Sequence, residues 1–426
     1  MFERQLIFDC IDLFSNNKKS KFYEKVFDTI DLSCFPEYPE SMRGPKGYSF
    51  HALFRAFIIM KCEKQRHITQ LVEFLDNNRY LAYLCGFDVF KDLPSYSVFQ
   101  RFIRNIDNEQ IKSLMKNQVL SLKKLGFIDN SFVSLDSTPV FANTKHNNPK
   151  SFSKNRFKKD NQPKSDRDCT LGVHTASNSH NEKKYEFYWG YKNHVLVDSI
   201  SGLPIFEFTS PANTSDSEAT IPLLKNVNSW FSLGETYFIA DKGYDTKAIH
   251  NFVRDDLLGH AFIPLNPRGK KGKKLLPAGN VICDAGLAMH KDGRQYFSDR
   301  IKQKFCCPFR TSKDDEACPF SHVHYFNGKK NRGCTRYITT GTDYRASINR
   351  ESKFFKSIYT LRTESERYNS RWKNLALEKP SARNISSISN LNTIGHICLL
   401  SIALAAIKDN SIDSTKSLSK LMKKAA

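Results

Sequence analysis

The stretch Tyr237-Phe-Ile-Ala-Asp241-Lys-Gly-Tyr244 predicts a short buried strand that ends in an acid and is followed by a turn. A second stretch, Phe132-Val-Ser-Leu-Asp136, has the same form and also ends in an acid. Folds that mix strands with helices place their ligands at strand ends, so two acids in such positions indicate a functional site. We therefore expect an α/β fold in which Asp136 and Asp241 lie side by side in the central sheet.

The residues between and after these two strands support the same fold class. Lys192–Asp198 and Pro204–Thr209 predict two strands joined by the turn Ser199–Gly202. Ser215 begins a helix with acids in its first turn, and Ala261–Pro264 predicts a further short strand. The order strand, hairpin, helix, strand, helix, strand is typical of a mixed α/β layer, and it makes the acid-ended strand after the helix the fourth one.

A third acid lies in the run Tyr359-Thr-Leu-Arg-Thr-Glu-Ser-Glu-Arg-Tyr-Asn-Ser-Arg-Trp-Lys373, whose pattern is Y-x2-R-x3-E-x6-K. At roughly 100° per residue of one continuous helix, the signature residues fall within about 60° of one face: Tyr359, Arg362, Glu366 and Lys373. The apolar side chains fall on the opposite face: Leu361, Tyr368, Trp372 and Leu375. Two interpretations stay open, namely a surface for a metal and a phosphate, or a solvated face with Arg362 and Glu366 as an i,i+4 ion pair.

The chemistry of phosphodiester cleavage and joining would use these residue types. Two hard cations roughly 4 Å apart neutralise the attacking and leaving oxygens, and they prefer oxygen ligands. Carboxylates from two strands and a facing helix could hold such a pair: Asp136, Asp241 and Glu366. Arg362 and Lys373 would then hold a nearby phosphate by charge, and Tyr359 could donate a hydrogen bond to it.

The composition points to a polyanionic partner. The 426 residues, of which 40% are hydrophobic, leave room for two or three domains with sizeable cores. The formal net charge of +21 favours a nucleic-acid partner over the alternative that the charge serves solubility alone. A membrane partner is not expected, because no Lys-rich helix has a bulky apolar face.

Three features indicate an intracellular protein. The first residues, Met1 to Gln5, lack the charged and apolar regions of a signal peptide. The longest apolar stretch, Ile394–Ile407, is interrupted by His396 and Ser401 and is expected to be too short and too polar to span a bilayer. The 11 cysteines are an odd number and scattered, which favours reduced thiols over disulfides.

The chain divides into four parts by composition. Residues 1–130 are predicted to be helical, and residues 131–265 form the first part of the α/β unit. Residues 266–352 are a basic, Cys-rich insertion, and residues 353–426 are a helical tail that completes the α/β unit. Within the second part, the polar and basic stretch 145–184 is expected to be a mobile loop.

The N-terminal part contains three helix signals, at residues 53–60, at residues 68–75 and a third whose cap is either Ser95 or Ser97. The third helix carries Arg101 and Arg104, so the arrangement is compatible with a DNA-reading module. A helical bundle that only packs on the next domain explains the same residues equally well.

The insertion gathers soft metal ligands. A zinc ion could be held by Cys306, Cys307, Cys318 and Cys334, with His322 or His324 as a further ligand. The two short Cys-x2–4-Cys pairs typical of zinc sites are absent, so reduced thiols that pack within the insertion are the alternative.

Several residues near these motifs could have either a functional or a purely structural role. Trp372 could stack on an unpaired base, but its position among apolar neighbours favours the core. His194 is expected to be a structural histidine rather than a ligand, and Asn213 and Asp216 a turn and a helix cap.

Taken together, these motifs resemble the DDE transposases of bacterial insertion sequences, in the subgroup with the Y-x2-R-x3-E-x6-K signature. The matching stretches are Leu93–Ser97, Ser134–Thr138, Gly190–Asp198, Pro211–Asp216, Ala240–Tyr244 and the Glu366 helix. The similarity runs over nearly the whole chain, and the helix signature is its most specific part.

The resemblance implies a ribonuclease H-like catalytic core, interrupted by the long insertion and preceded by an all-helical domain that binds DNA ends. It implies that Asp136, Asp241 and Glu366 bind two Mg²⁺ or Mn²⁺ ions, and that Tyr359, Arg362 and Lys373 contact the DNA backbone. Its implied substrates are the terminal inverted repeats of the element and target DNA, which a homodimer or higher assembly would join in the cytoplasm at the bacterial nucleoid. Two rivals are a catalytically inactive transposase-derived DNA-binding protein and a nuclease without repeat specificity.

Overall fold

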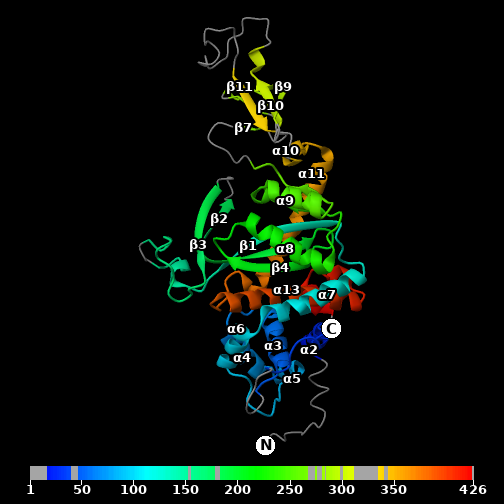
Figure 1. Ribbon diagram of the computed structural model, residues 1–426. Helices are drawn as coiled ribbons and strands as arrows, with labels where there is room; N and C mark the ends of the chain where they lie inside the picture. Colours follow the sequence, from blue (N-terminus) through cyan, green and yellow to red (C-terminus); the bar gives the residue numbers. More distant parts are fainter. Residues whose placement is uncertain are drawn as a thin grey trace, which may run out of the picture.

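A six-stranded sheet lies at the centre of the computed structural model (Figure 1). The structure describes residues 17–39, 47–151, 155–177, 183–266, 274–275, 281–283, 285–297, 301–310, 334–339 and 344–424. The strands are β1 (Phe132–Phe141), β2 (Thr170–Ser177), β3 (Lys183–Asp198), β4 (Pro204–Pro211), β5 (Tyr237–Ala240) and β6 (His260–Phe262). Together with the helices around them, they make a mixed α/β fold.

The sheet order places β1 in the middle. The strands follow the order β2-β3-β1-β5-β6, and β4 also pairs with β3. β1 is antiparallel to β3 and parallel to β5, and β5 is parallel to β6. The 16-residue β3 pairs with β2 through its first half and with β4 through its second, with the change at Gly190 and Tyr191. The long hairpin predicted from the sequence is therefore present, and the sheet curls along β3.

The first strand does not end at Asp136, so that prediction was wrong. β1 continues to Phe141 because its later residues still pair with β3, from Ser137 opposite His194 onward. Its other side loses its partner, since the pairing with β5 stops at Leu135. Leu135 is the last residue of β1 with a partner strand on both sides, and Asp136 follows it directly. Proline has no backbone N–H to donate, so Pro139 is tolerated where β1 has a partner strand on one side only.

The stretch 145–184 is largely structured where it is described, which corrects the expectation of a mobile loop. It contains the 3-10 turn η1 (Lys145–Asn147), strand β2 and the start of β3. Its apolar partners come from elsewhere, because Leu171 pairs with Trp189 and Cys169 is fully buried. Asp166 accepts a hydrogen bond from the Tyr191 hydroxyl at 2.7 Å. With β2 present, Asp241 follows the fifth strand and not the fourth.

The N-terminal helices share one hydrophobic core with the rest of the protein. They are α2 (Lys18–Phe27), α3 (Phe50–Cys62), α4 (Ile68–Asn77), α5 (Arg79–Cys85), α6 (Tyr96–Asn105) and α7 (Asn108–Lys124). The three helix signals in the sequence correspond to α3, α4 and α6, and Ser95 is the N-cap of α6. A single cluster of buried apolar side chains includes residues from Phe22 in α2 to Leu421 near the C-terminus.

One long helix joins the N-terminal helices to the sheet. α13 (Ile385–Lys408) contacts α2, α3, α6 and α7 on one side and β4 on the other (Figure 1). It is longer than the apolar stretch read from the sequence, and by length and composition it could cross a membrane, contrary to the expectation. However, 94% of its most apolar 18-residue window is buried inside the protein, as in a core helix.

The remaining helices pack on the sheet or on other helices. They are α8 (Asp216–Phe231), η2 (Lys242–Tyr244), α9 (Lys247–Asn251), η3 (Phe252–Asp256), α10 (Tyr344–Ser347), α11 (Lys353–Tyr359), η5 (Thr360–Arg362), α12 (Thr363–Trp372), η6 (Lys373–Leu377), η7 (Ile412–Ser414) and α14 (Leu418–Lys424). Ser215 is the N-cap of α8, as the sequence predicted.

The insertion carries strands and a small core of its own. Its described elements are β7 (Lys274–Leu275), β8 (Val281–Ile282), β9 (His290–Tyr296), β10 (Ile301–Cys306), η4 (Pro308–Arg310) and β11 (Thr335–Thr339). Val281, Cys283, Met289 and Phe305 form a cluster separate from the main core. In Figure 1 this unit stands beyond α10, away from the central sheet.

Candidate active site

Two of the predicted acids lie next to each other at the centre of the sheet. Leu135 of β1 pairs in parallel with Ala240 of β5, and Asp136 and Asp241 are the next residues of these two strands. Asp136 is half-buried, and its Oδ2 accepts a hydrogen bond from the Asn369 side chain at 3.0 Å. Asp241 caps η2, because its Oδ1 accepts from the Gly243 backbone N–H at 2.6 Å.

The third acid reaches this place from α12, which contacts both β1 and β3. Glu366 is exposed, and its Oε1 forms an ion pair with Arg362 Nη1 at 2.6 Å. The i,i+4 pair that was one reading of this helix is therefore formed. Burial alone would lower the pKa of Arg362, but Tyr359, Asp136 and Glu366 together raise it. The same guanidinium thus lies within electrostatic reach of two of the three acids.

The pKa of Asp136 reports how closely the acids converge. This pKa is raised overall to about 6: burial raises it most, Arg362 lowers it, and Asp241 and Glu366 raise it. Repulsion from both other carboxylates means that all three share one electrostatic environment. Within the described chain, no three Asp, Glu, His or Cys side chains are close enough to enclose a cation without moving. The three carboxylates therefore lie near one another but are too far apart to coordinate one cation in their present positions.

Tyr359 also belongs to this group. Burial raises its pKa, Arg362 lowers it, and Asp241, Glu366 and Asp136 raise it. Its ring stacks on Phe355 with centroids 6.1 Å apart, which fixes the phenol against the helix α11 that precedes it. Tyr359 and Arg362 are thus both within electrostatic reach of the acids.

Lys373 lies further along the same groove. A groove of about 660 Å³ is lined by Asp136, Glu366, Asn369 and Lys373, among others. The sequence predicted one continuous helix from Tyr359 to Leu375, and this prediction was wrong. The 3-10 turn η5 interrupts the α-helical geometry, and the backbone of Leu375 and Ala376 in η6 is not helical. Lys373 Nζ pairs with Glu378 at 2.9 Å, so the structure brings it to the groove but not to Arg362.

A fourth carboxylate stands behind the first two. Asp216 Oδ1 accepts from Ser137 Oγ and from Lys192 Nζ, each at 3.0 Å. The buried hydroxyl of Tyr244 has a raised pKa, caused first by burial and then by Asp216, Asp136 and Asp241. Asp216 therefore shares the field of the acid cluster. The prediction that Asp216 is a helix cap was wrong, because Ser215 is the N-cap and Asp216 is the first residue of α8.

The back of α12 is fixed in the core. Trp372 is fully buried and stacks on His396 with ring centroids 5.7 Å apart, so the core interpretation of this tryptophan was correct. Tyr368 also hydrogen-bonds His396, whose Nε2 lies 2.9 Å from Asn193 Oδ1. Burial lowers the pKa of His396 to about 3, so its ring is neutral at physiological pH. These contacts hold the acid-bearing face of α12 over the sheet.

The other end of α12 rests on the β3–β4 turn. Arg371 Nη2 donates to the Gly202 carbonyl at 2.5 Å. Gly202 has φ +67°, and a Cβ there would lie 2.6 Å from Glu364 Oε2. Only glycine fits this contact without strain or displacement.

Comparison with known proteins assigns the chain to a family. Residues 121–400, more than half of the chain, match the family model described as "Transposase DDE domain". The chain belongs to the DDE transposase family. Residues 11–105 of this transposase also match a model described as "Transposase domain (DUF772)".

Two further comparisons give little for this transposase. No curated protein matches it. It is similar to a chain in the "Cryo-EM structure of piggyBac transposase synaptic complex with hairpin DNA", with 11% identity and a TM-score of 0.37 over 99% of this chain and 80% of that one. A likeness of this size is too distant to transfer any feature.

Sequence reasoning missed Asn369 in this transposase. It lies three residues after Glu366, so it falls on the same side of the helix. That spacing was the available signal. His194, by contrast, is a buried histidine as expected, with Nε2 2.9 Å from Ser210 Oγ and a pKa lowered to about 4, mainly by burial.

The cysteines of the insertion are only partly described. Cys306 Sγ donates to Asp292 Oδ2 at 2.7 Å, and the backbone N–H of Cys307 donates to the Cys334 carbonyl at 2.9 Å. Cys318, His322 and His324 lie outside the described residues. Zinc binding by these cysteines therefore stays a prediction.

Proposed function

We propose that this chain is an active DNA transposase that binds the terminal inverted repeats of an insertion sequence, cleaves phosphodiester bonds and transfers the 3′-hydroxyl ends to target DNA. The observation that carries the proposal is the convergence of Asp136, Asp241 and Glu366, expressed in the pKa of about 6 for Asp136. Membership of the DDE transposase family supports the same chemistry.

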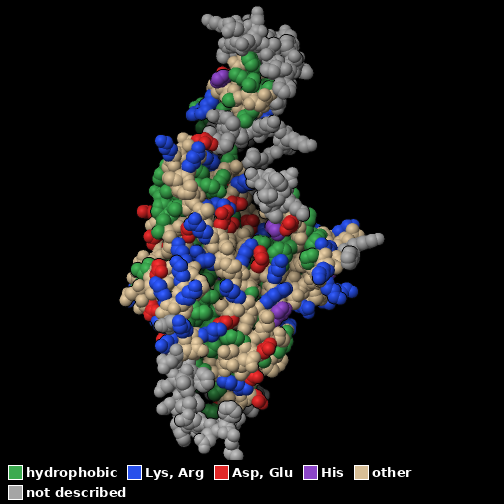
Figure 2. Space-filling model, turned by 180° about the vertical axis from the view of Figure 1, so that it is seen from behind, with side chains coloured by type: hydrophobic (Ala, Val, Ile, Leu, Met, Phe, Trp, Pro, Cys, Tyr) green, Lys and Arg blue, Asp and Glu red, His purple; other side chains and the backbone are tan. Residues whose placement is uncertain are grey.

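The catalytic unit of the proposal is a ribonuclease H-like core interrupted by residues 266–352. Its support is the strand order β4-β3-β1-β5-β6, in which the first three strands are antiparallel and the last two follow β1 in parallel. The helices before residue 130 would bind the element's ends. This role is supported by the net charge of +21 and by the Lys and Arg side chains spread over the face shown in Figure 2.

The donor set fits two Mg²⁺ or Mn²⁺ ions. Carboxylate oxygens are the ligands that these hard cations prefer, and three carboxylates that repel one another are stabilised by added positive charge. When bound, such ions supply an activated water and neutralise the charge that develops on the phosphate. Asp136, Asp241 and Glu366 would hold them.

The neighbouring residues would hold and orient the DNA. Arg362 already shields Asp136 and Glu366, so its guanidinium is placed to hold the phosphate beside the cut. Tyr359 would donate a hydrogen bond there, and Lys373 would hold a second phosphate along the groove. Asn369 is a positioning residue, because its amide fixes one oxygen of Asp136. A homodimer or larger assembly on DNA is part of the proposal, since joining requires both element ends, and the place of action is the cytoplasm at the nucleoid.

A cleavage and joining assay tests the function. Labelled duplexes carrying the element's own end, and duplexes with that end scrambled, are incubated with the protein and Mg²⁺ or Mn²⁺. We expect nicks at the repeat boundary and joined products only with the native end, and neither after Glu366→Gln, which keeps the size of the side chain but removes its charge. Tight binding without any cutting would support the inactive relative, and equal cutting of scrambled DNA without joining would support a nonspecific nuclease.

A further inference from the structure

A second polar cavity lies between the N-terminal helices and the catalytic unit. It has a volume of about 340 Å³ and is lined by residues from four separate parts of the chain, of which residues 67–69 form the start of α4 and the residue before it. Gln100 and Arg104 come from α6, Asn143 follows β1, and Arg383 precedes α13. None of the described residues that line it is acidic. We call it the arginine cavity, after Arg104 and Arg383.

The two arginines of this cavity are exposed and unpaired. Neither Arg104 nor Arg383 has a hydrogen bond or an ion pair within the described ranges. In the active-site groove, by contrast, Arg362 is paired with Glu366 and Lys373 with Glu378. An anion that enters the arginine cavity therefore breaks no existing ion pair, and it meets two guanidinium groups whose geometry suits a phosphate.

The arginine cavity lies near the active-site groove, because the same two segments of chain reach both. Phe141 and Lys379 line the groove, whereas Asn143 and Arg383, a few residues further along the same two segments, line the cavity. The segments run together, because the Phe141 N–H donates to the Glu378 carbonyl at 2.8 Å and the Asn143 side chain donates to the Ser381 carbonyl at 2.9 Å. Lys379 in the groove and Arg383 in the cavity are four residues apart, and four residues of extended chain span at most about 14 Å. This distance corresponds to roughly four base-pair steps of B-DNA.

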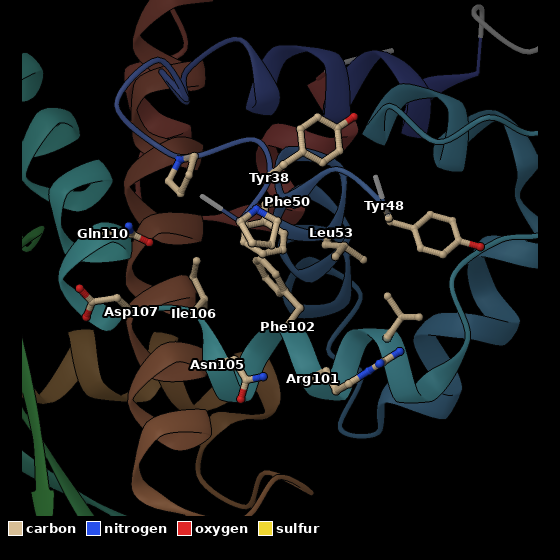
Figure 3. Close-up of a pocket in the computed structure, with 14 residues that line it drawn as sticks. Tyr38, Tyr48, Phe50, Leu53, Arg101, Phe102, Asn105, Ile106, Asp107 and Gln110 are labelled. Atoms are coloured by element: carbon tan, nitrogen blue, oxygen red, sulfur yellow. The ribbon is translucent and has the colours of Figure 1, made fainter. Parts of the chain in front are cut away.

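The larger cavity on the other side of α6 has different chemistry (Figure 3). It measures about 660 Å³ and is lined mainly by apolar side chains such as Phe50, Leu53 and Phe102, together with the acid Asp107. Arg101 lines this apolar cavity, and its Nε donates to the Ser97 carbonyl at 3.3 Å. The two arginines that the sequence placed together on α6 therefore face different surroundings, and only Arg104 faces a cavity without an acid.

From this arrangement we infer that the arginine cavity is a phosphate-binding subsite for the DNA backbone, a few base pairs from the cut. Arg104 and Arg383 hold the phosphate, and Gln100 donates to it from the same helix as Arg104. The inference rests on the proposed function, since it names the DNA contact between the catalytic groove and the N-terminal helices. It also gives Arg383, which no motif singled out, a role in DNA binding.

The test compares the double variant R104Q/R383Q with R254Q, which changes an arginine that is already paired with Asp255 and lies outside the N-terminal helices. Binding to a duplex with the native end is measured by fluorescence anisotropy across a series of salt concentrations. Each phosphate contact contributes about 0.9 to the slope of log affinity against log salt. We therefore expect the slope of R104Q/R383Q to fall by about 2 at most and by about 1 if both arginines share one phosphate. R254Q should keep the wild-type slope, and R104K/R383K, which keeps the charges, should restore most of it.

Duplex length gives a second readout. Duplexes are shortened from either side of the cut until they no longer reach the arginine cavity. On these short duplexes, wild type and R104Q/R383Q should bind with equal affinity. An unchanged slope for R104Q/R383Q on long DNA, while wild type still binds and nicks, overturns the inference and leaves the proposed function intact. Wild type that neither binds nor nicks the native end overturns both. If inorganic phosphate raises the melting temperature of wild type but not of R104Q/R383Q, and the DNA slopes are equal, the cavity binds free phosphate and the DNA assignment is wrong.

Discussion

Asp136→Asn is predicted to stabilise the protein at neutral pH while it removes catalysis. The substitution keeps the shape of the side chain and an oxygen that can accept from Asn369. It removes a carboxylate whose pKa is raised from 3.8 to about 6 by burial and by its acidic neighbours. Because the pKa is raised on folding, ionising Asp136 costs more free energy in the folded state than in the unfolded state, and the ionised group lowers the stability of the fold.

The size of the effect follows from the shift. A difference of about 2 pKa units corresponds to at most about 3 kcal/mol at 1.4 kcal/mol per unit. For a chain of this length, an unfolding entropy of about 2 cal/mol/K per residue converts this into an increase in melting temperature of roughly 3 °C.

The sign depends on pH in a defined way. Below about pH 4, Asp136 is protonated in both states, so wild type and Asp136→Asn should be equally stable. As the pH rises from 4 to 6, the unfolded chain loses this proton first, wild type loses stability and the variant does not. Above about pH 6 the difference should be constant.

Thermal unfolding followed by tryptophan fluorescence across this pH range measures the effect. Asp255→Asn is a matched control, because Asp255 is an exposed aspartate paired with Arg254 and away from the acid cluster. It should not raise the melting temperature. A variant Asp136→Asn that melts below wild type at pH 7, or a difference that does not vary between pH 4 and 6, would show that the acids do not repel one another as described.

Two further predictions concern the supports of the site. Gly202→Ala should lower the melting temperature and slow nicking, because a positive φ costs an alanine about 1 kcal/mol or more and its Cβ would meet Glu364; unchanged melting and nicking would refute the docking role of this turn. Asp245→Asn should loosen the base of the insertion. Burial alone would raise the pKa of Asp245, but hydrogen bonds from His250 and Arg345 hold it well below its usual range, and the Asn266 N–H also donates to it at 2.7 Å. Losing this charge beside Arg345 and the buried Arg350 should cost about 3 kcal/mol. The expected result is faster proteolysis within 266–352 than in an Asp255→Asn control, which changes an exposed aspartate outside the insertion, and equal rates would contradict the clamp.

The sequence was most informative where structure depends on local pattern. Asp136 and Asp241 each follow a short apolar run, and such a run forms a buried strand almost wherever it occurs in an α/β chain. The Glu366 helix was read from its 3.6-residue period, which also placed Trp372 in the core correctly.

The sequence was least informative where structure depends on distant partners. β2 was missed because its few apolar residues, Leu171, Val173 and Ala176, lie in a polar and basic stretch, and its partners Trp189 and Tyr188 come from β3. The contact of Asp216 with Ser137 and Lys192 joins three elements, and no local spacing encodes it. The length of α13 was underestimated because it includes polar residues such as Asn390 and Thr393, which accept hydrogen bonds from the Asn108 side chain.

The most direct test of the central claim is metal-dependent rescue of Asp136→Cys. Mg²⁺ coordinates oxygen and avoids sulfur, whereas Mn²⁺ accepts softer ligands more readily. If Asp136 is a ligand of the catalytic cations, Asp136→Cys should bind the native end normally, fail to nick it with Mg²⁺ and regain nicking with Mn²⁺. Asp136→Ala, which offers no ligand, should stay inactive with both ions. Equal activity of Asp136→Cys with Mg²⁺ and Mn²⁺, or recovery of Asp136→Ala with Mn²⁺, would contradict metal binding by this carboxylate.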